Sequence, residues 1–185
     1  LAKTLTIVDE NQVQEIRENW EETHAENVLF SQKGGQTDML SSFADISIVG
    51  GGRGGGKTFV LLMNALYDIT DPHLRAIIFR KELDDLSDII DTSGEIYKEF
   101  GTYNRAKNDM TWNFANGGWL TFSFHDMDYT DFHDRYQGKQ YPYIAIDEVT
   151  QMSYQKFKVL TMSNRNAYGI RNRIVGSCNP DPDSW

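Results

Sequence analysis

The sequence has a single cysteine, Cys178, among its 185 residues. One thiol excludes an intrachain disulfide framework and a zinc site built from several cysteines, which favours a reducing compartment. The chain also lacks the uncharged apolar run of ~18 residues that a membrane span requires, and no charged-then-apolar leader opens it. We therefore expect a folded protein of the cytoplasm with no membrane partner.

Basic residues are scarce, with 18 Lys and Arg against 27 Asp and Glu, which leaves a net charge of −9. Such a surface repels a phosphate backbone, so any nucleic acid must be held by a local basic patch, another subunit or another domain. With 39% hydrophobic residues the chain has enough apolar side chains for one core. Because it starts at Leu1 and stops at Trp185, soon after Asn-Pro-Asp-Pro, we expect a fragment of a longer protein.

Apolar periodicity predicts alternating strands and helices. An amphipathic helix is expected between residues 9 and 26, followed by a loop over 30–36. The expected strands are 46–49 (a buried one), 75–80, 143–146 and 173–178, with a hairpin of 110–114 and 119–124 around Asn116-Gly117-Gly118, and the expected helices are 57–67, 82–100 and 154–162. This order implies an α/β fold with a mainly parallel central sheet and helices on both faces.

The strongest motif is the glycine-rich segment 51–58. It reads Gly51-Gly52-Arg53-Gly54-Gly55-Gly56-Lys57-Thr58 and matches G-x-x-x-x-G-K-[ST] between a predicted strand and a predicted helix. Glycines are needed because backbone N–H groups wrap a polyphosphate, and a Cβ would keep them at a distance. Lys57 supplies a charge for the β- and γ-phosphates, and the Thr58 hydroxyl is a Mg²⁺ ligand. The alternative, a flexible glycine linker, matches all the specified positions only rarely by chance.

Acidic and amide side chains follow two other predicted strands. Asp147 and Glu148 end the strand 143–146, where Asp147 is placed to hold Mg²⁺ and Glu148 to deprotonate a water aimed at the γ-phosphate. This pair favours hydrolysis over transfer to a small acceptor, although acidic pairs are also common at solvated strand ends. Asn179 faces the same crevice if the last strand neighbours the other two, whereas Asn-Pro alone is a turn signal.

Two further groups of polar residues carry weaker signals. Gln36 lies in a loop whose Phe30 is suited to cover a base, and its amide is suited to read the edge of adenine; an ordinary polar loop explains it equally well. A second group lacks the regular spacing of metal ligands, so we expect a charged loop there and no metal. Its members are His125, Asp126, Asp128, Asp131, His133 and Asp134.

In combination, these motifs resemble the large terminase subunit, the packaging motor of tailed bacteriophages and herpesviruses. The resemblance spans residues 30–185 and depends on the order of the motifs. They are Gln36-Thr37-Asp38-Met39-Leu40, the loop with its arginine, Phe79-Arg80-Lys81, Asn116-Gly117-Gly118, Tyr136-Gln137-Gly138, the strand ending in Asp147-Glu148, and Cys178-Asn179-Pro180. The resemblance implies a P-loop ATPase domain over 30–185, a helical segment over 1–29, and an RNase H-like nuclease domain beyond residue 185.

The resemblance also implies roles for single residues. By analogy, Lys57 and Thr58 bind phosphate and Mg²⁺, Arg53 contacts phosphate and Gln36 recognises adenine, while the acidic pair serves the metal and the attacking water. Asn179 is expected to sense the loss of the γ-phosphate. Several relatives place an inter-subunit arginine where this chain has Gln137, which leaves that residue unassigned. Arg135 and Lys139 flank the position, either as candidates or as ordinary surface charges.

The expected function is ATP hydrolysis that drives viral double-stranded DNA into procapsids in the cytoplasm of the infected host. The implied partners are the portal protein, the small terminase subunit and further copies of this chain in a ring. Two alternatives remain open: another nucleic-acid motor of the helicase or recombination type, and a nucleotide-gated assembly module with little hydrolysis of its own. The isolated chain is expected to bind DNA weakly.

Overall fold

The computed structural model of the chain describes residues 35–52, 54–106 and 109–179. The helix expected between residues 9 and 26 and the proposed helical segment 1–29 lie outside these ranges. The elements in chain order are α3 (Gly35–Leu40), β1 (Ile46–Gly50), α4 (Lys57–Ala65), η1 (Leu66–Asp68), β2 (Arg75–Arg80), α5 (Leu86–Tyr97), β3 (Gly101–Asn104), β4 (Thr111–Phe114), β5 (Trp119–Phe124), α6 (Tyr129–Tyr136), β6 (Tyr143–Ile146), η2 (Val149–Gln151), α7 (Tyr154–Ser163) and β7 (Arg173–Cys178).

The described strands form one sheet in the order β1-β7-β6-β2-β5-β4-β3. The first five strands of this order pair in parallel, and β4 and β3 continue the sheet in antiparallel pairing. The predicted hairpin is present as β4 and β5. A mainly parallel sheet is therefore confirmed, with a short antiparallel extension at one edge.

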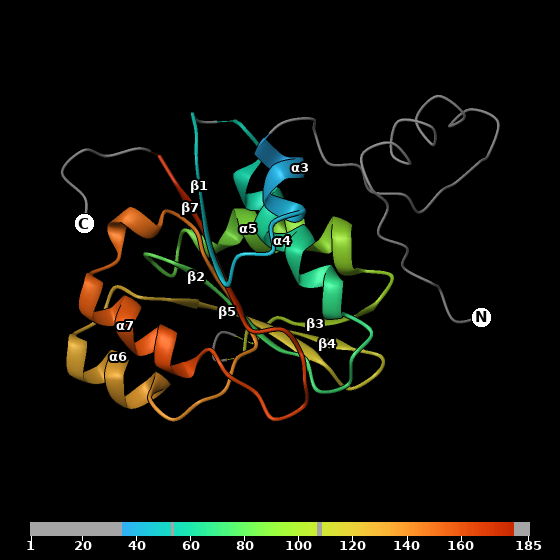
Figure 1. Cartoon of the computed structure of the whole chain (residues 1–185). Helices are drawn as coiled ribbons and strands as arrows, with labels where there is room; N and C mark the ends of the chain where they lie inside the picture. The colour runs from blue at the N-terminus through green and yellow to red at the C-terminus, as the bar shows by residue number, and fades with distance from the viewer. Residues whose placement is uncertain (1–34, 53, 107–108, 180–185) are drawn as a thin grey trace.

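Helices cover both faces of this sheet (Figure 1). In β2, Ala76 and Ile78 pack in the core shared with α4 and α5, whereas Ile77 and Phe79 pack in the core shared with α6 and α7. Successive side chains of a strand point to opposite faces, so a strand covered on both faces reads as a continuous apolar run. That property made these strands visible in the sequence.

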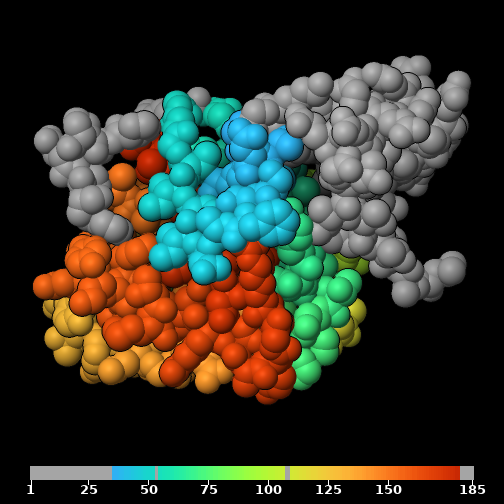
Figure 2. Space-filling model, in the orientation of Figure 1, coloured from blue at the N-terminus to red at the C-terminus, as the bar shows by residue number. Residues whose placement is uncertain are grey.

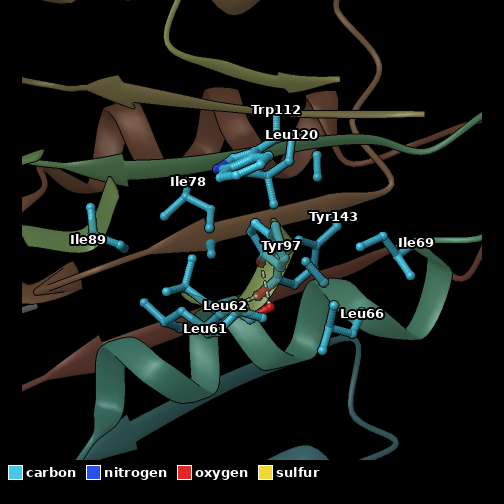
Figure 3. Close-up of a cluster of buried hydrophobic side chains, with 14 of the residues drawn as sticks. Leu61, Leu62, Leu66, Ile69, Ile78, Ile89, Tyr97, Trp112, Leu120 and Tyr143 are labelled. Carbon is cyan, nitrogen blue, oxygen red and sulfur yellow. Dashed lines mark hydrogen bonds between the residues drawn. The ribbon is translucent and has the colours of Figure 1, made fainter. Parts of the chain in front are cut away.

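The helix that follows the glycine loop, α4, is held from two sides (Figure 3). The Tyr97 hydroxyl, from α5, donates to the carbonyl of Leu62 at 2.6 Å, and the Tyr143 hydroxyl, from β6, donates to the carbonyl of Leu61 at 2.6 Å. Both phenols are fully buried, and burial raises the pKa of Tyr97 and of Tyr143. The hydroxyls therefore stay protonated as donors, and α4 has fixed anchors in the core.

The strand β1 lies at an edge of the sheet, which corrects the expectation that it is buried. Among the described strands it pairs with β7 alone, and Ile46 and Ile48 are 47% and 52% exposed. Figure 2 shows the residues around β1, in cyan, on the surface of the molecule. A β-branched run predicts a strand, but its place in the sheet depends on pairing with a segment far away in the chain.

Three other expectations need correction. Gln36 lies in the helix α3 and not in a loop. The expected charged loop contains the helix α6, because Phe132 and Tyr136, four residues apart, are buried against the core on its inner side. The strand β3 was not predicted at all. In the described part of the chain, no helix combines the length and apolar character needed to cross a membrane.

Candidate active site

Four adjacent parallel strands bring the predicted polar residues to one edge of the sheet. β1 leads into the glycine loop, β7 ends just before Asn179, β6 ends just before Asp147, and β2 ends at Arg80. In open α/β sheets, ligands bind in the crevice outside the carboxyl ends of parallel strands. The neighbouring positions that Asn179 and the acidic pair required are confirmed by the pairing of β6 with β7.

The glycine loop turns sharply from β1 into α4. Gly54 and Gly56 have φ of 79° and 66°, a left-handed backbone conformation that residues with a Cβ rarely adopt. The Gly51 N–H donates to the carbonyl of Cys178 at 3.2 Å and so extends the pairing of β1 with β7. A cleft of about 120 Å³ lies between the loop, α3 and the start of α4. Arg53 lies outside the described residues.

The Lys57 ammonium uses its donors within the loop and on Asn179. Its Nζ donates to the carbonyls of Gly51 and Gly52 at 2.7 and 2.9 Å, and to Oδ1 of Asn179 at 3.0 Å. Lysine offers three N–H donors, so this set accounts for all of them. The positive charge is thereby placed at the start of α4, beside the carboxyl end of β7.

Asn179 connects Lys57 to Glu148. While its Oδ1 accepts from Lys57, its Nδ2 donates to Oε1 of Glu148 at 2.8 Å and its backbone N–H donates to Oε2 at 3.2 Å. Both carboxylate oxygens of Glu148 are therefore held by one residue. The arrangement is a continuous hydrogen-bonded path from the loop lysine to the predicted catalytic base.

Asp147 is 3% exposed and has partners on both carboxylate oxygens. Oδ2 accepts from Thr58 Oγ1 at 3.1 Å and from Nε and Nη2 of Arg80 at 2.8 and 2.6 Å. Oδ1 accepts from the Ser177 hydroxyl, whose oxygen in turn accepts the Glu148 N–H at 3.2 Å. The charge of a buried carboxylate requires such compensation, which the guanidinium supplies.

Arg80 and Ser177 were not predicted as site residues. Both end, or nearly end, predicted strands of the parallel sheet. That location was the signal that could have found them, since the carboxyl ends of neighbouring strands meet at one edge.

The oxygen donors of Thr58 and Asp147 fit a hard divalent cation such as Mg²⁺. No group of three or more His, Cys, Asp or Glu side chains in the described ranges is arranged to hold a metal ion. A cation here therefore needs further oxygen ligands, and Mg²⁺ typically takes these from water and from substrate phosphates.

The remaining predicted residues lie around this network. Gln36 is 6% exposed in the first turn of α3, and its Nε2 donates to the carbonyl of Gly55 at 3.4 Å, so a contact with a base stays a prediction. Arg135 is exposed in the last turn of α6, and Lys139 is exposed in the connection to β6. A role for either in a neighbouring subunit also stays a prediction.

Solved structures with this fold share little sequence with the chain. The HK97 bacteriophage large terminase superposes with a TM-score of 0.59 at 10% identity, over 81% of this chain and 33% of its own. For the large terminase ATPase domain of Thermus phage P74-26 the values are 0.63, 12%, 87% and 70%. For the large terminase of another thermophilic bacteriophage, in complex with ADP, they are 0.60, 20%, 82% and 39%. These likenesses show a shared P-loop-like α/β fold.

The chain covers only part of these proteins, about a third of the HK97 protein. None of the curated proteins matches it. Residues 48–185 match the family described as "Terminase large subunit, T4likevirus-type, N-terminal". The match includes the glycine loop, the acidic pair and Asn179, the residues that meet at the carboxyl edge of the sheet. The chain therefore belongs to the family of N-terminal domains of large terminase subunits.

Proposed function

We propose that this chain is the ATPase domain of a viral DNA-packaging motor, which binds Mg·ATP at the glycine loop and hydrolyses it to move double-stranded DNA. The observation that carries the proposal is the path Lys57–Asn179–Glu148 beside the pair Thr58–Asp147. It joins a phosphate-binding lysine, a base and two oxygen ligands at one edge of the sheet. Membership of the terminase family supports the packaging role.

The phosphates would be bound by the loop and by the start of α4. Backbone N–H groups at a helix N-terminus favour negative charge, and the Lys57 ammonium adds a full positive charge. Because Lys57 already donates to two loop carbonyls and to Asn179, a phosphate oxygen that accepts from Nζ competes with one of these bonds. We assign Arg53, which lies in the same loop, a phosphate contact as well.

Hydrolysis requires a group that accepts a proton from the attacking water. Glu148 is the candidate, since its carboxylate lies at the loop edge and is oriented through both oxygens by Asn179. Thr58 and Asp147 would hold Mg²⁺, which supplies charge neutralisation on the phosphates when it is bound. Asn179 contacts both Lys57 and Glu148, so a change at the γ-phosphate reaches the base through one side chain.

The partners follow from the family and from the charge of the chain. As a packaging motor, the domain would act in a ring of copies on a portal protein together with a small terminase subunit. A nuclease domain that cuts the DNA would belong to the rest of the large subunit. Because the chain carries a net charge of −9, the surface that tracks DNA is expected to come from the ring or from the rest of the protein.

Two substitutions test the ATPase proposal. Lys57→Ala should weaken binding of Mg·ATP by about 10-fold or more, because a charge-assisted contact is lost. Glu148→Gln should keep ATP affinity within about threefold and lower the single-turnover hydrolysis rate by about 10²- to 10⁴-fold. Equilibrium binding of a fluorescent ATP analogue and release of labelled phosphate measure the two effects separately.

Matched controls are available on α5. Lys98 and Glu95 form an exposed ion pair there, so Lys98→Ala and Glu95→Gln remove the same groups away from the site and should leave both readouts unchanged. Wild-type hydrolysis retained by Glu148→Gln would contradict the assignment of the base. Binding of Mg·ATP with no turnover, even in the full-length protein with portal and DNA, would favour an assembly module over a motor.

A further inference from the structure

The side chain of Gln36 is packed against the glycine loop. Besides the hydrogen bond from its Nε2 to the carbonyl of Gly55, a Cβ added to Gly56 would overlap that nitrogen. The amide therefore lies directly on the Gly55–Gly56 peptide, where the loop turns into α4. From its place on a separate helix, Gln36 is thus suited to control the shape of this turn.

The helix that carries Gln36 is itself fixed to the body of the domain. Met39 is buried in the core that α4 forms with the sheet, and the Tyr67 hydroxyl donates to the carbonyl of Leu40 at 2.6 Å. Since α3 is anchored at these two points, its first turn is a stationary support. Burial also restricts the rotamers of Gln36, so the amide has a defined position.

The loop needs such support because of its composition. Glycine has more backbone freedom than any other residue, and a glycine-rich loop loses much entropy when it orders around a ligand. A contact that fixes one peptide of the loop in advance lowers this cost. Gly56 holds a left-handed conformation at the contact itself, directly before Lys57.

We propose that Gln36 is a positioning residue for the phosphate-binding loop, whose amide holds the Gly55–Gly56 peptide so that the loop N–H groups converge on a triphosphate. The inference rests on the proposed nucleotide binding. Reading the edge of adenine requires the amide donor and acceptor together, and here the donor is directed at Gly55. Loss of the amide therefore weakens the binding of any triphosphate, whichever base it carries.

Gln36→Leu tests the proposal, because it removes the amide and keeps the bulk of the side chain. Titrations of the full chain in Mg²⁺ with ATP, GTP and inorganic tripolyphosphate should give Kd values that all rise by the same factor, about 2- to 10-fold. The ratio of the ATP and GTP values should stay that of the wild type. Ser41→Ala, an exposed neutral change just after α3, should leave all three Kd values unchanged.

Other outcomes point elsewhere. A rise in Kd for ATP alone, with GTP and tripolyphosphate unchanged, would overturn the proposal and assign Gln36 to the base. Unchanged Kd values for all three ligands would overturn it too. If the wild-type chain binds none of the three, it is the proposed function that fails.

A double-mutant cycle tests the contact without any ligand. In Gly56→Ala the new Cβ displaces the Gln36 amide, so adding Gln36→Leu should lower Tm by less than Gln36→Leu does in the wild type. Circular dichroism of the four proteins gives the values. Fully additive changes in Tm would show that the amide does not support the loop and would overturn the proposal.

Discussion

At the scale of single residues, the backbone of Glu148 is unusual. Its φ and ψ are both 55°, and it is the one non-glycine residue with positive φ in the described part of the chain. For a residue with a Cβ this conformation costs about 1–2 kcal/mol. The cost is met locally, because its N–H donates to Ser177, its carbonyl accepts from Gln151, and Asn179 holds its carboxylate. The turn lets two consecutive carboxylates reach different partners.

Replacing Glu148 by glycine or by alanine should separate this strain from the chemistry. Both variants lose the carboxylate and the hydrolysis that depends on it. Because glycine tolerates positive φ, Glu148→Gly should have a free energy of unfolding about 1 kcal/mol higher than Glu148→Ala, as measured in urea. At Gln151, in the helical turn η2, the order should reverse. Equal stability of the two Glu148 variants would mean that the backbone stores no strain there.

The residues that the sequence identified are those whose requirement is local. A loop that wraps phosphate needs glycines next to a lysine and a hydroxyl, and this requirement leaves a contiguous motif. The partners of Asp147 are different, since Arg80 and Ser177 lie 67 and 30 residues away from it in the chain. Locally, an arginine at a strand end that compensates a buried carboxylate reads like one that points into solvent, so only the strand order reveals it.

At the scale of elements, the sequence predicted what burial alone encodes. β2, β6 and β7 are covered on both faces and appeared as apolar runs at their correct places. The edge position of β1 was not predictable, because it depends on which strands pair. α6 was hidden by its acidic residues, which occupy its solvent side while two aromatic side chains fix the helix from within.

One arginine connects β7 to the end of α4. Arg173 is buried, donates to Oδ1 and to the carbonyl of Asn64 at 2.7 Å each, and forms an ion pair with Asp68 at 2.5 Å. Its guanidinium also lies 4.8 Å from the centroid of the Tyr143 ring. These contacts hold the far end of the helix whose first residue is Lys57. The pair thus fixes α4 in the direction along which its N-terminus faces the loop.

Arg173→Lys should therefore be costly although it conserves the charge. An ammonium cannot reproduce the planar fork that serves Asn64 and Asp68 together, so we expect a loss of about 2–4 kcal/mol in the free energy of unfolding. Denaturant titration measures it, with the exposed Arg171→Lys as the control, for which we expect less than about 0.5 kcal/mol. A similarly small loss for Arg173→Lys would mean that the fork is not needed.

At the scale of the whole molecule, stability should depend on pH through His125. This residue is 3% exposed, and burial together with the Lys156 ammonium lowers the pKa of His125 from 6.5 to about 4. Its Nε2 has no hydrogen-bond partner within the described ranges. Between pH 6.5 and 4 the unfolded chain therefore binds a proton that the folded chain does not, and the folded state loses stability as the pH falls.

The substitution His125→Gln removes this titration and keeps a side chain of similar size. Going from pH 7 to pH 5, the wild type should lose about 1–2 kcal/mol more of its free energy of unfolding than the variant does. Urea titrations of both proteins at several pH values give the difference, in which the shared titration of the carboxylates cancels. Parallel pH profiles for the two proteins would contradict a buried neutral histidine.

The net charge of the molecule sets its behaviour toward DNA. A protein gains affinity for a duplex by neutralising phosphates and releasing counterions, and a chain with a charge of −9 repels the duplex before any local contact forms. We therefore expect the chain alone to bind a short labelled duplex with a Kd above about 10⁻⁴ M at about 0.15 M salt. Fluorescence anisotropy over a range of salt concentrations measures both the affinity and its salt dependence.

The salt dependence decides between two sources of the tracking surface. If the ring or the rest of the large subunit supplies the basic groups, the full-length protein should bind the same duplex more tightly, with a steeper loss of affinity as salt rises. If the chain alone binds with a Kd below about 10⁻⁶ M and a steep slope, a local basic patch must outweigh the overall charge. The same domain would then both hydrolyse ATP and hold the DNA that it moves, instead of acting on DNA held elsewhere in the motor.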